Sequence, residues 1–259
     1  MALKHLMLKY WKSFYVSLLI WQLVFIPIYV SDGQSTSFKG SVDFQSPLEN
    51  YIGGIDISKH NGAVDWEELE AHRKTENYPH FVFIKATEGS DFKDVLFEEN
   101  WEQAREHNFV RGAYHFFSLI SDPRKQAQYY LKTVDFRKQD FLPILDFETT
   151  SGSHKSSQRI AADVKIWLDT VEENLGVKPI IYTNTPMYKR IVKKYFPDYP
   201  LWISDYDSPN IKDFDSKELL IWQYSQSGSV KGIKGAVDLN VFIGTPHKFQ
   251  KYHLKENNN

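Results

Sequence analysis

The sequence contains no cysteine. A disulfide framework, a zinc site built on thiolates and a cysteine nucleophile are therefore all excluded. The chain has 259 residues, of which 42% are hydrophobic. This is enough to form one sizeable hydrophobic core, so an exported form could be stable without covalent cross-links.

The sequence also lacks a surplus of charge of either sign. Its 31 basic and 33 acidic residues give a net charge of −2, and no long basic block is present. Nothing in this balance indicates nucleic acid as a partner. No pair of histidines has metal-ligand spacing, and no phosphate-binding loop, dinucleotide fingerprint or Gly-x-Ser-x-Gly motif occurs. We therefore expect neither a metal site nor a cofactor.

The N-terminus carries an export pattern. Lys4, Lys9 and Lys12 precede an apolar run over residues 14–30, and no Ala-x-Ala-like cleavage site follows it. We predict that residues 1–30 are a signal or membrane anchor with the lysines on the cytoplasmic side. An uncleaved anchor with the protein facing outward is favoured over a secreted or periplasmic form. Residues 31–50 are predicted to be a linker, and residues 247–259 a polar tail.

Between the linker and the tail, β-branched apolar runs alternate with helical patterns, which indicates an α/β fold with a parallel sheet. Capping signals mark the helices: Asp65 before 66–73, Asp122 before Pro123, and Gly176 after 160–175. Two more helices are expected, one with an apolar stripe through Val95, Leu96 and Trp101, the other over 187–195. The predicted strands are 53–57, 81–86, 112–117, 142–147, 179–183, 201–204, 219–224 and 237–242. Eight strands with about five helices predict a TIM-like (β/α) barrel whose closing part is simplified, in a domain over residues 51–246.

Acidic residues gather where the predicted strands end. Asp56 ends the first strand, Asp146 and Glu148 end the fourth, and Asp238 lies beside the eighth. Function in such barrels sits at the C-terminal face. Because alternate strand residues share one face, Asp146 and Glu148 should both point into the mouth, roughly 6–7 Å apart along the strand.

Paired carboxyl groups of this kind suit glycoside cleavage. Each disfavours ionisation of the other, so one can stay protonated while its neighbour is charged. The acid protonates the leaving oxygen, and the carboxylate supports positive charge at the sugar carbon. Either member of the Asp146–Glu148 pair could be the acid by this reasoning.

Other polar and aromatic side chains fall at the same strand ends and are candidates for substrate binding. Aromatic faces suit the apolar faces of sugar rings, so some of Tyr182, Trp202, Tyr206, Trp222 and Tyr224 should be platforms rather than core. The candidates for binding substrate are Lys85, Tyr114, His115, Tyr182, Trp202, Asp205 and Gln223.

The segments GGIDIS, FVFIKATEGSDFKD, RGAYHFFS, LPILDFE, PIIYTN, LWISDYD, IWQYSQSG and VDLNVF resemble, in order, the strand-end motifs of glycoside hydrolase family 25 lysozymes. The resemblance covers about residues 51–246. It implies hydrolysis of the β-1,4 bond after N-acetylmuramic acid in peptidoglycan, with retention, by an enzyme expected to be a monomer. By motif, Glu148 corresponds to the general acid/base and Asp146 to its partner in an N-acetyl-assisted route. On that assignment we expect Glu148 to be protonated, with its pKa raised by Asp146 and by partial burial, and Asp146 to remain ionised. Asp56 and Asp238 correspond to flanking acids of the cleft.

One segment departs from the family pattern. Where many members carry a Trp-Gln pair after the first acid, this chain has Lys59-His60-Asn61-Gly62. Two alternatives also remain open from the residues alone. One is another acetamido-sugar glycosidase such as a chitinase, and the other is a membrane-tethered protein that binds glycan without cutting it.

Overall fold

The computed structural model describes residues 52–76, 78–148, 154–206 and 219–255. The predicted anchor and linker lie outside the described residues. Within the described ranges, no helix combines the length and the apolar character needed to cross a membrane.

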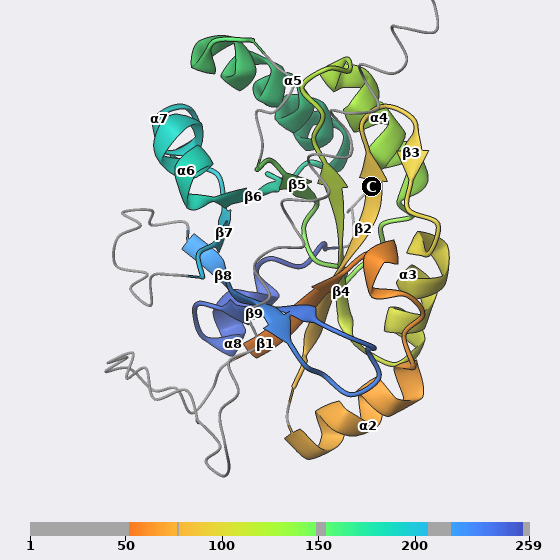
Figure 1. Ribbon diagram of the computed structural model, residues 1–259. Coiled ribbons are helices and arrows are strands. Elements are labelled where there is room, and N and C mark those ends of the chain that lie inside the picture. The colour runs from red at the N-terminus through yellow and green to blue at the C-terminus, as the bar shows by residue number, and fades with distance from the viewer. Residues whose placement is uncertain (1–51, 77, 149–153, 207–218, 256–259) are drawn as a thin grey trace, which may run out of the picture. The chain divides into compact units, whose positions relative to one another are not determined.

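The described residues form a closed barrel (Figure 1). Each strand is hydrogen-bonded to its neighbours in the order β1-β9-β8-β7-β6-β5-β4-β2, and β2 pairs again with β1. A short strand, β3 (Phe92–Lys93), extends the sheet beside the end of β2. The barrel strands are β1 (Ile52–Ile57), β2 (Phe81–Glu88), β4 (Val110–Phe116), β5 (Ile144–Asp146), β6 (Ile180–Asn184), β7 (Leu201–Ser204), β8 (Leu219–Gly228) and β9 (Val237–Phe242). The predicted eight-stranded barrel is confirmed.

The expectation of an all-parallel sheet is wrong at the closing strand. β9 runs antiparallel to both β8 and β1. The connection from Gly228 to Val237 is too short for a crossover, which takes a dozen or more residues, so the chain turns back directly. As a result β9 begins, rather than ends, at the mouth where the other strands end, and Asp238 at its start still reaches the mouth.

Helices cover the outside of the barrel, as Figure 1 shows for the four longest. Asp65 and Asp122 accept hydrogen bonds from the backbone of the first turns that follow them, and Gly176 adopts the left-handed conformation, so these three signals are confirmed. Val95 was wrongly placed in an apolar stripe, because it precedes its helix and is 76% exposed. The predicted helix 187–195 is confirmed within a continuous helical segment, Thr185–Tyr195, whose middle part, Tyr188–Val192, is a π-helix. The helices are η2 (Lys59–Asn61), α2 (Trp66–Glu76), α3 (Phe97–Glu106), α4 (Pro123–Thr133), α5 (Ser157–Leu175), α6 (Thr185–Met187), η3 (Tyr188–Val192), α7 (Lys193–Tyr195) and α8 (Pro246–Gln250).

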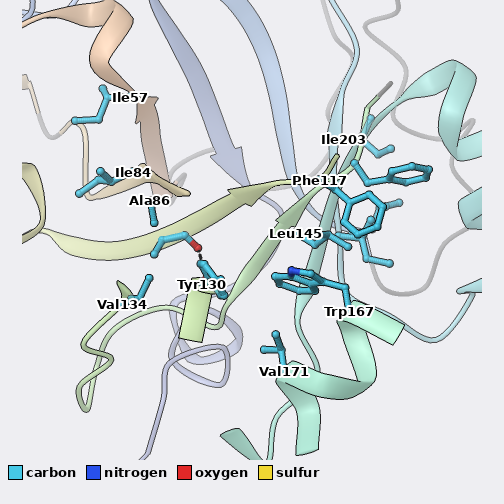
Figure 2. Close-up of a cluster of buried hydrophobic side chains, with 14 of the residues drawn as sticks. Ile57, Ile84, Ala86, Phe117, Tyr130, Val134, Leu145, Trp167, Val171 and Ile203 are labelled. Carbon is cyan, nitrogen blue, oxygen red and sulfur yellow. Dashed lines mark hydrogen bonds between the residues drawn. The ribbon is translucent and has the colours of Figure 1, made fainter. Parts of the chain in front are cut away.

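Strand alternation divides the core into two layers. On β2, Val82 and Ile84 belong to the outer layer, which packs against the helices, whereas Phe81 and Phe83 belong to the layer inside the barrel. Figure 2 shows part of the outer layer, with Trp167 of α5 beside Leu145 of β5. The inner layer fills the barrel below the mouth, so the mouth rests on packed side chains.

The polar tail expected from residue 247 onward belongs to the barrel as far as residue 255. Phe249 on α8 is buried against Phe81, Phe141 and Phe242 at the base. The backbone of Tyr252 accepts a hydrogen bond from Leu142. Phe249, whose neighbours in the sequence are lysine and glutamine, thus closes the end of the barrel opposite the mouth.

A buried ion pair holds the outer layer between β4 and α3. Arg111 is 1% exposed, donates to both carboxylate oxygens of Asp140 at 2.7 and 3.2 Å, and lies 3.9 Å from the ring centre of Trp101. Arg111→Met leaves Asp140 unpaired in the interior and should lower the free energy of unfolding by about 3–5 kcal/mol. Arg105→Met, which breaks an exposed pair with Glu102, should cost only about 0–1 kcal/mol. If urea unfolding showed equal losses of stability in Arg111→Met and Arg105→Met, the buried pair would not stabilise the fold more than the exposed one.

Candidate active site

The inward row of the barrel turns polar at the mouth. Ile144 on β5 lies in the inner layer, so Asp146, two residues on, shares that inner face. Its register partner on β6 is Tyr182, and the partner of Tyr182 on β7 is Trp202. The strand pattern therefore places a carboxyl group beside two aromatic side chains at one level of the barrel.

These side chains line a cleft of about 290 Å³. All four predicted acids lie in it, together with five of the seven predicted binding residues. No group of three or more acidic or histidine side chains in the described ranges is placed to hold a metal ion. The lining residues are Asp56, Ser58, His60, Lys85, Tyr114, Phe116, Asp146, Glu148, Tyr182, Trp202, Tyr206, Gln223, Gln226 and Asp238.

The segment that carries Glu148 is held by β6. The Thr183 hydroxyl donates to the backbone oxygen of Phe147 at 2.6 Å, and Asn184 Nδ2 donates to that of Glu148 at 2.8 Å. Asn184 Oδ1 in turn accepts from the backbone of Met187, so the side chain also caps α6. Glu148 thus lies on a fixed backbone beyond the end of β5.

Burial raises the pKa of both members of the Asp146–Glu148 pair, but more strongly for Asp146. Asp146 is 7% exposed, and its Oδ1 is buried without a hydrogen-bond partner among the described residues. The charge of Glu148 then raises the pKa of Asp146 further. Burial therefore raises the pKa of Glu148, as predicted, whereas the repulsion within the pair raises the pKa of Asp146, the more buried carboxyl group, which was expected to remain ionised.

Lys85 moderates this effect. Its positive charge lowers the pKa of both Asp146 and Glu148. The ammonium group is paired with Glu88 at 2.7 Å and lies 4.7 Å from the ring centre of Phe116. It is thereby fixed at the edge of the cleft.

Asp56 and Asp238 form a second carboxyl pair. They face each other directly in the pairing of β1 with β9, and their carboxyl groups are hydrogen-bonded. Burial raises the pKa of Asp56 to about 8, and repulsion from Asp238 adds to the shift. At neutral pH Asp56 therefore holds a proton and donates it to Asp238.

Two amides fix the orientation of Asp56. Its Oδ2 accepts from Gln223 Nε2 at 2.8 Å and from Asn240 Nδ2 at 2.7 Å. The Trp202 indole donates to Asn240 Oδ1 at 2.8 Å. Because an indole can only donate, it determines which way the Asn240 amide points. With Oδ2 occupied by two donors, the proton of Asp56 belongs on Oδ1, towards Asp238.

The aromatic residues divide between core and cleft. Tyr182 and Tyr206 line the cleft with their hydroxyl groups near Gln223. Trp202, expected to be a sugar platform, is 2% exposed and packs on Phe83 and Tyr182, so it is chiefly a core residue. Trp222 and Tyr224 lie beside each other and are not among the residues that line this cleft.

Two predicted binding residues lie elsewhere. His115 is fully buried on the outer face of β4, where it hydrogen-bonds to Thr87 and Gln126 and stacks on Trp167. Burial lowers its pKa to about 3, so it is neutral. Its neighbour Tyr114 takes the inward position that strand alternation allows. Asp205 accepts a hydrogen bond from Thr185 and joins the loops that follow β6 and β7.

Sequence reasoning missed Asn240, Asn184 and His60. Asn240 was detectable, because it stands two residues after Asp238 on a predicted strand and must share its face. Asn184 and His60 carried no such signal. His60 belongs to the departing segment Lys59-His60-Asn61-Gly62, whose 3-10 helix is capped by Ser58 and presents His60 to the cleft.

Asp56 should make the stability of the protein depend on pH. The folded carboxyl keeps its proton to about pH 8, whereas the unfolded one releases it near pH 4. Its contribution to stability is thus complete below about pH 4 and is lost as the pH rises to 8, by roughly 1.4 kcal/mol per pH unit. Asp56→Asn preserves the hydrogen bonds, since its amide can accept from Gln223 and Asn240 and donate to Asp238. The variant should gain stability over the native protein between pH 5 and 7.

Urea unfolding at several pH values measures this difference. Asp56→Leu is the control, because it leaves both amide donors unpaired and should lower stability at every pH. If the free energy of unfolding depended on pH in the same way in the native protein and in Asp56→Asn, Asp56 would not be protonated in the folded protein.

Comparisons with known proteins agree with this geometry. The family model "Glycosyl hydrolases family 25" matches residues 55–233. The chain is 38% identical over 206 residues to the uncharacterized protein YegX of Escherichia coli K12, covering 80% of this chain and 75% of that protein. It is 32% identical over 191 residues to the autolytic lysozyme of Clostridium acetobutylicum, covering 73% and 55%.

Solved structures give the same result. A family 25 glycosyl hydrolase from Bacillus anthracis superposes with a TM-score of 0.69 at 31% identity, covering 78% of this chain and 93% of that one. A family GH25 lysozyme from Aspergillus fumigatus gives a TM-score of 0.69 at 27% identity, covering 80% and 100%. The resemblance inferred from the strand-end motifs is confirmed: the chain belongs to glycosyl hydrolase family 25.

Proposed function

We propose that the chain is a peptidoglycan muramidase, which cleaves the β-1,4 bond between N-acetylmuramic acid and N-acetylglucosamine. The observation that carries the proposal is the pairing of Asp146 with Glu148 in one partly buried cleft. Family membership and the lysozyme activity named for its relatives support it.

The state of Asp146 supports a route assisted by the acetamido group of the substrate. Its buried Oδ1 has no partner in the described structure, and a substrate acetamido N–H is a suitable donor. A hydrogen bond to the charged form lowers the pKa of a carboxyl group. Substrate would thereby favour ionised Asp146 and leave Glu148 as the protonated member of the pair.

In the first step Glu148 gives its proton to the glycosidic oxygen and the bond to the anomeric carbon breaks. The acetamido oxygen bonds to that carbon, while Asp146 holds the N–H and stabilises the developing positive charge. In the second step Glu148 accepts a proton from water, whose oxygen adds to the anomeric carbon and displaces the acetamido oxygen. Two displacements retain the configuration, and no sugar becomes linked to the enzyme.

This proposal is favoured over both alternatives. A protein that only binds glycan has no need of a carboxylic acid with a raised pKa, whereas acid catalysis depends on one. Membership in a family of glycosyl hydrolases makes the chain an enzyme. The curated relatives that are named for an activity are lysozymes and a muramidase, which favours peptidoglycan over a chitinase-type substrate.

Glu148→Gln tests the assignment of the acid. The amide cannot donate a proton to the leaving oxygen, so turnover of purified peptidoglycan should fall at least 10²-fold, with little change in fold or in pelleting with the substrate. Asp146→Asn should lose less, since its amide oxygen can still accept a hydrogen bond from the acetamido N–H. Exposed Glu67→Gln on α2 is the control and should retain full turnover. Near-native dye release by Glu148→Gln would remove Glu148 from the mechanism.

We further propose that residues 14–30 direct export, with the barrel outside the cytoplasmic membrane and an uncleaved N-terminus as anchor. The support is the run of lysines before the apolar stretch. Fractionation of the native protein should find it in the membrane, and a chain starting at residue 31 should stay in the cytosol. A full-length protein in the cytosol would contradict export, whereas a shortened N-terminus would contradict only the anchor.

A further inference from the structure

The hydroxyl group of Tyr182 lies between the catalytic acid and a buried amide. It contacts Gln223 Oε1 at 2.9 Å and is hydrogen-bonded to the Glu148 carboxyl group. A second hydroxyl, that of Tyr206, lies 2.5 Å from the same Gln223 oxygen and is also hydrogen-bonded to Tyr182. Both tyrosines therefore lie within hydrogen-bonding distance of Gln223 Oε1, and Tyr182 also contacts Glu148.

The orientation of Gln223 is fixed from the opposite side. Its Nε2 donates to Asp56 Oδ2, whose other donor is Asn240. Asp56 Oδ2 can only accept, so the Gln223 amide cannot turn over without losing this bond. Gln223 Oε1 consequently faces the two tyrosines and needs a donor from at least one of them.

A phenol has a single proton to donate, and Tyr182 has three acceptors for it: Gln223 Oε1, the Glu148 carboxyl group and the Tyr206 oxygen. Burial raises the pKa of Tyr182 well above its usual value, so the proton stays on the hydroxyl. When Glu148 is ionised, the Tyr182 proton is best given to that carboxylate, since hydrogen bonds to charged acceptors are the stronger ones. When Glu148 is protonated, it can donate to the Tyr182 oxygen, and the Tyr182 proton is free to bind Gln223.

We propose that the Tyr182 hydroxyl alternates between Gln223 and Glu148 as Glu148 changes from acid to base, and that Tyr206 makes this possible. Tyr206 keeps Gln223 Oε1 hydrogen-bonded while Tyr182 turns to the carboxylate. The hydroxyl only rotates, and no proton leaves either tyrosine. Both protonation states of Glu148 are thereby hydrogen-bonded, which the two steps of the proposed muramidase reaction require; the inference rests on that function for its role in turnover.

The titratable groups that surround Glu148 come from several elements, and each could contribute to a change in its titration. They are Asp56 on β1, His60 on η2, Lys85 and Glu88 on β2, Tyr114 on β4, Asp146 on β5, Tyr182 on β6, Tyr206 after β7 and Asp238 on β9. The test therefore compares tyrosine variants that leave every carboxyl group, His60 and Lys85 in place.

The experiment is an NMR titration of the ligand-free protein labelled with ¹³C at the glutamate carboxyl carbon, in which Glu148→Gln identifies the Glu148 signal. Tyr182→Phe removes the donor to the carboxylate, so the pKa of Glu148 should rise by about 1. In Tyr206→Phe, only Tyr182 can donate to Gln223 Oε1, so Tyr182 donates less often to Glu148. The pKa of Glu148 should therefore rise by a smaller amount than in Tyr182→Phe. The double variant should match Tyr182→Phe alone, because Tyr206 acts only through Tyr182. Tyr224→Phe, which removes a hydroxyl outside this network, is the matched control.

An unchanged Glu148 titration in Tyr206→Phe, or effects of the two variants that add, would overturn the proposal. The titration needs no substrate, so it is independent of the proposed function. The second measurement is the pH profile of peptidoglycan turnover by Tyr206→Phe. The pH at which its activity falls on the alkaline side should be higher than in the native protein, by the same amount as the pKa of Glu148. If the titrations are as predicted but the native protein releases no sugar from peptidoglycan, the muramidase activity is refuted and the proposed role of the two tyrosines is not.

Discussion

The free energy needed to take carboxylates out of water governs how this barrel mouth is built. Four carboxyl groups enter one cleft, and Asp56 and Asp146 are almost fully buried. In the free protein, desolvation and the charge of a neighbour raise the pKa of both. The remaining features follow from this constraint. Amide donors orient Asp56, Lys85 offsets part of the negative charge, and two tyrosines surround the acceptor that Gln223 presents.

The barrel supplies what these groups require. Strand alternation puts Asp146, Tyr182 and Trp202 in one inward row, while the outward residues pack against the helices. Below the row, aromatic rings fill the interior down to Phe249, which closes the base. The mouth therefore lies above a packed interior, and hydrogen bonds between neighbouring strands orient its polar groups.

The barrel and its acids could be predicted because they depend on local signals: alternation along strands, capping residues and carboxyl groups at strand ends. The features that could not be predicted depend on tertiary contacts. The direction of β9 follows from a short connection, and the burial of Phe249 follows from a cavity at the barrel base. His115 was misplaced because the sequence does not show which face of a largely apolar strand meets the helices. Trp202 has the expected inward position, but its depth of burial depends on the packing of Phe83 and Tyr182 around it. The strong rise in the pKa of Asp146 depends on its depth in the cleft.

The most direct test of the account is to identify the new reducing ends that the purified enzyme releases from peptidoglycan. Reduction of the digest with borohydride, acid hydrolysis and mass spectrometry separate the two possible sugar alcohols. The account predicts the alcohol derived from N-acetylmuramic acid, formed by the native protein and absent with Glu148→Gln. The alcohol derived from N-acetylglucosamine, or equal release by the variant, would contradict it.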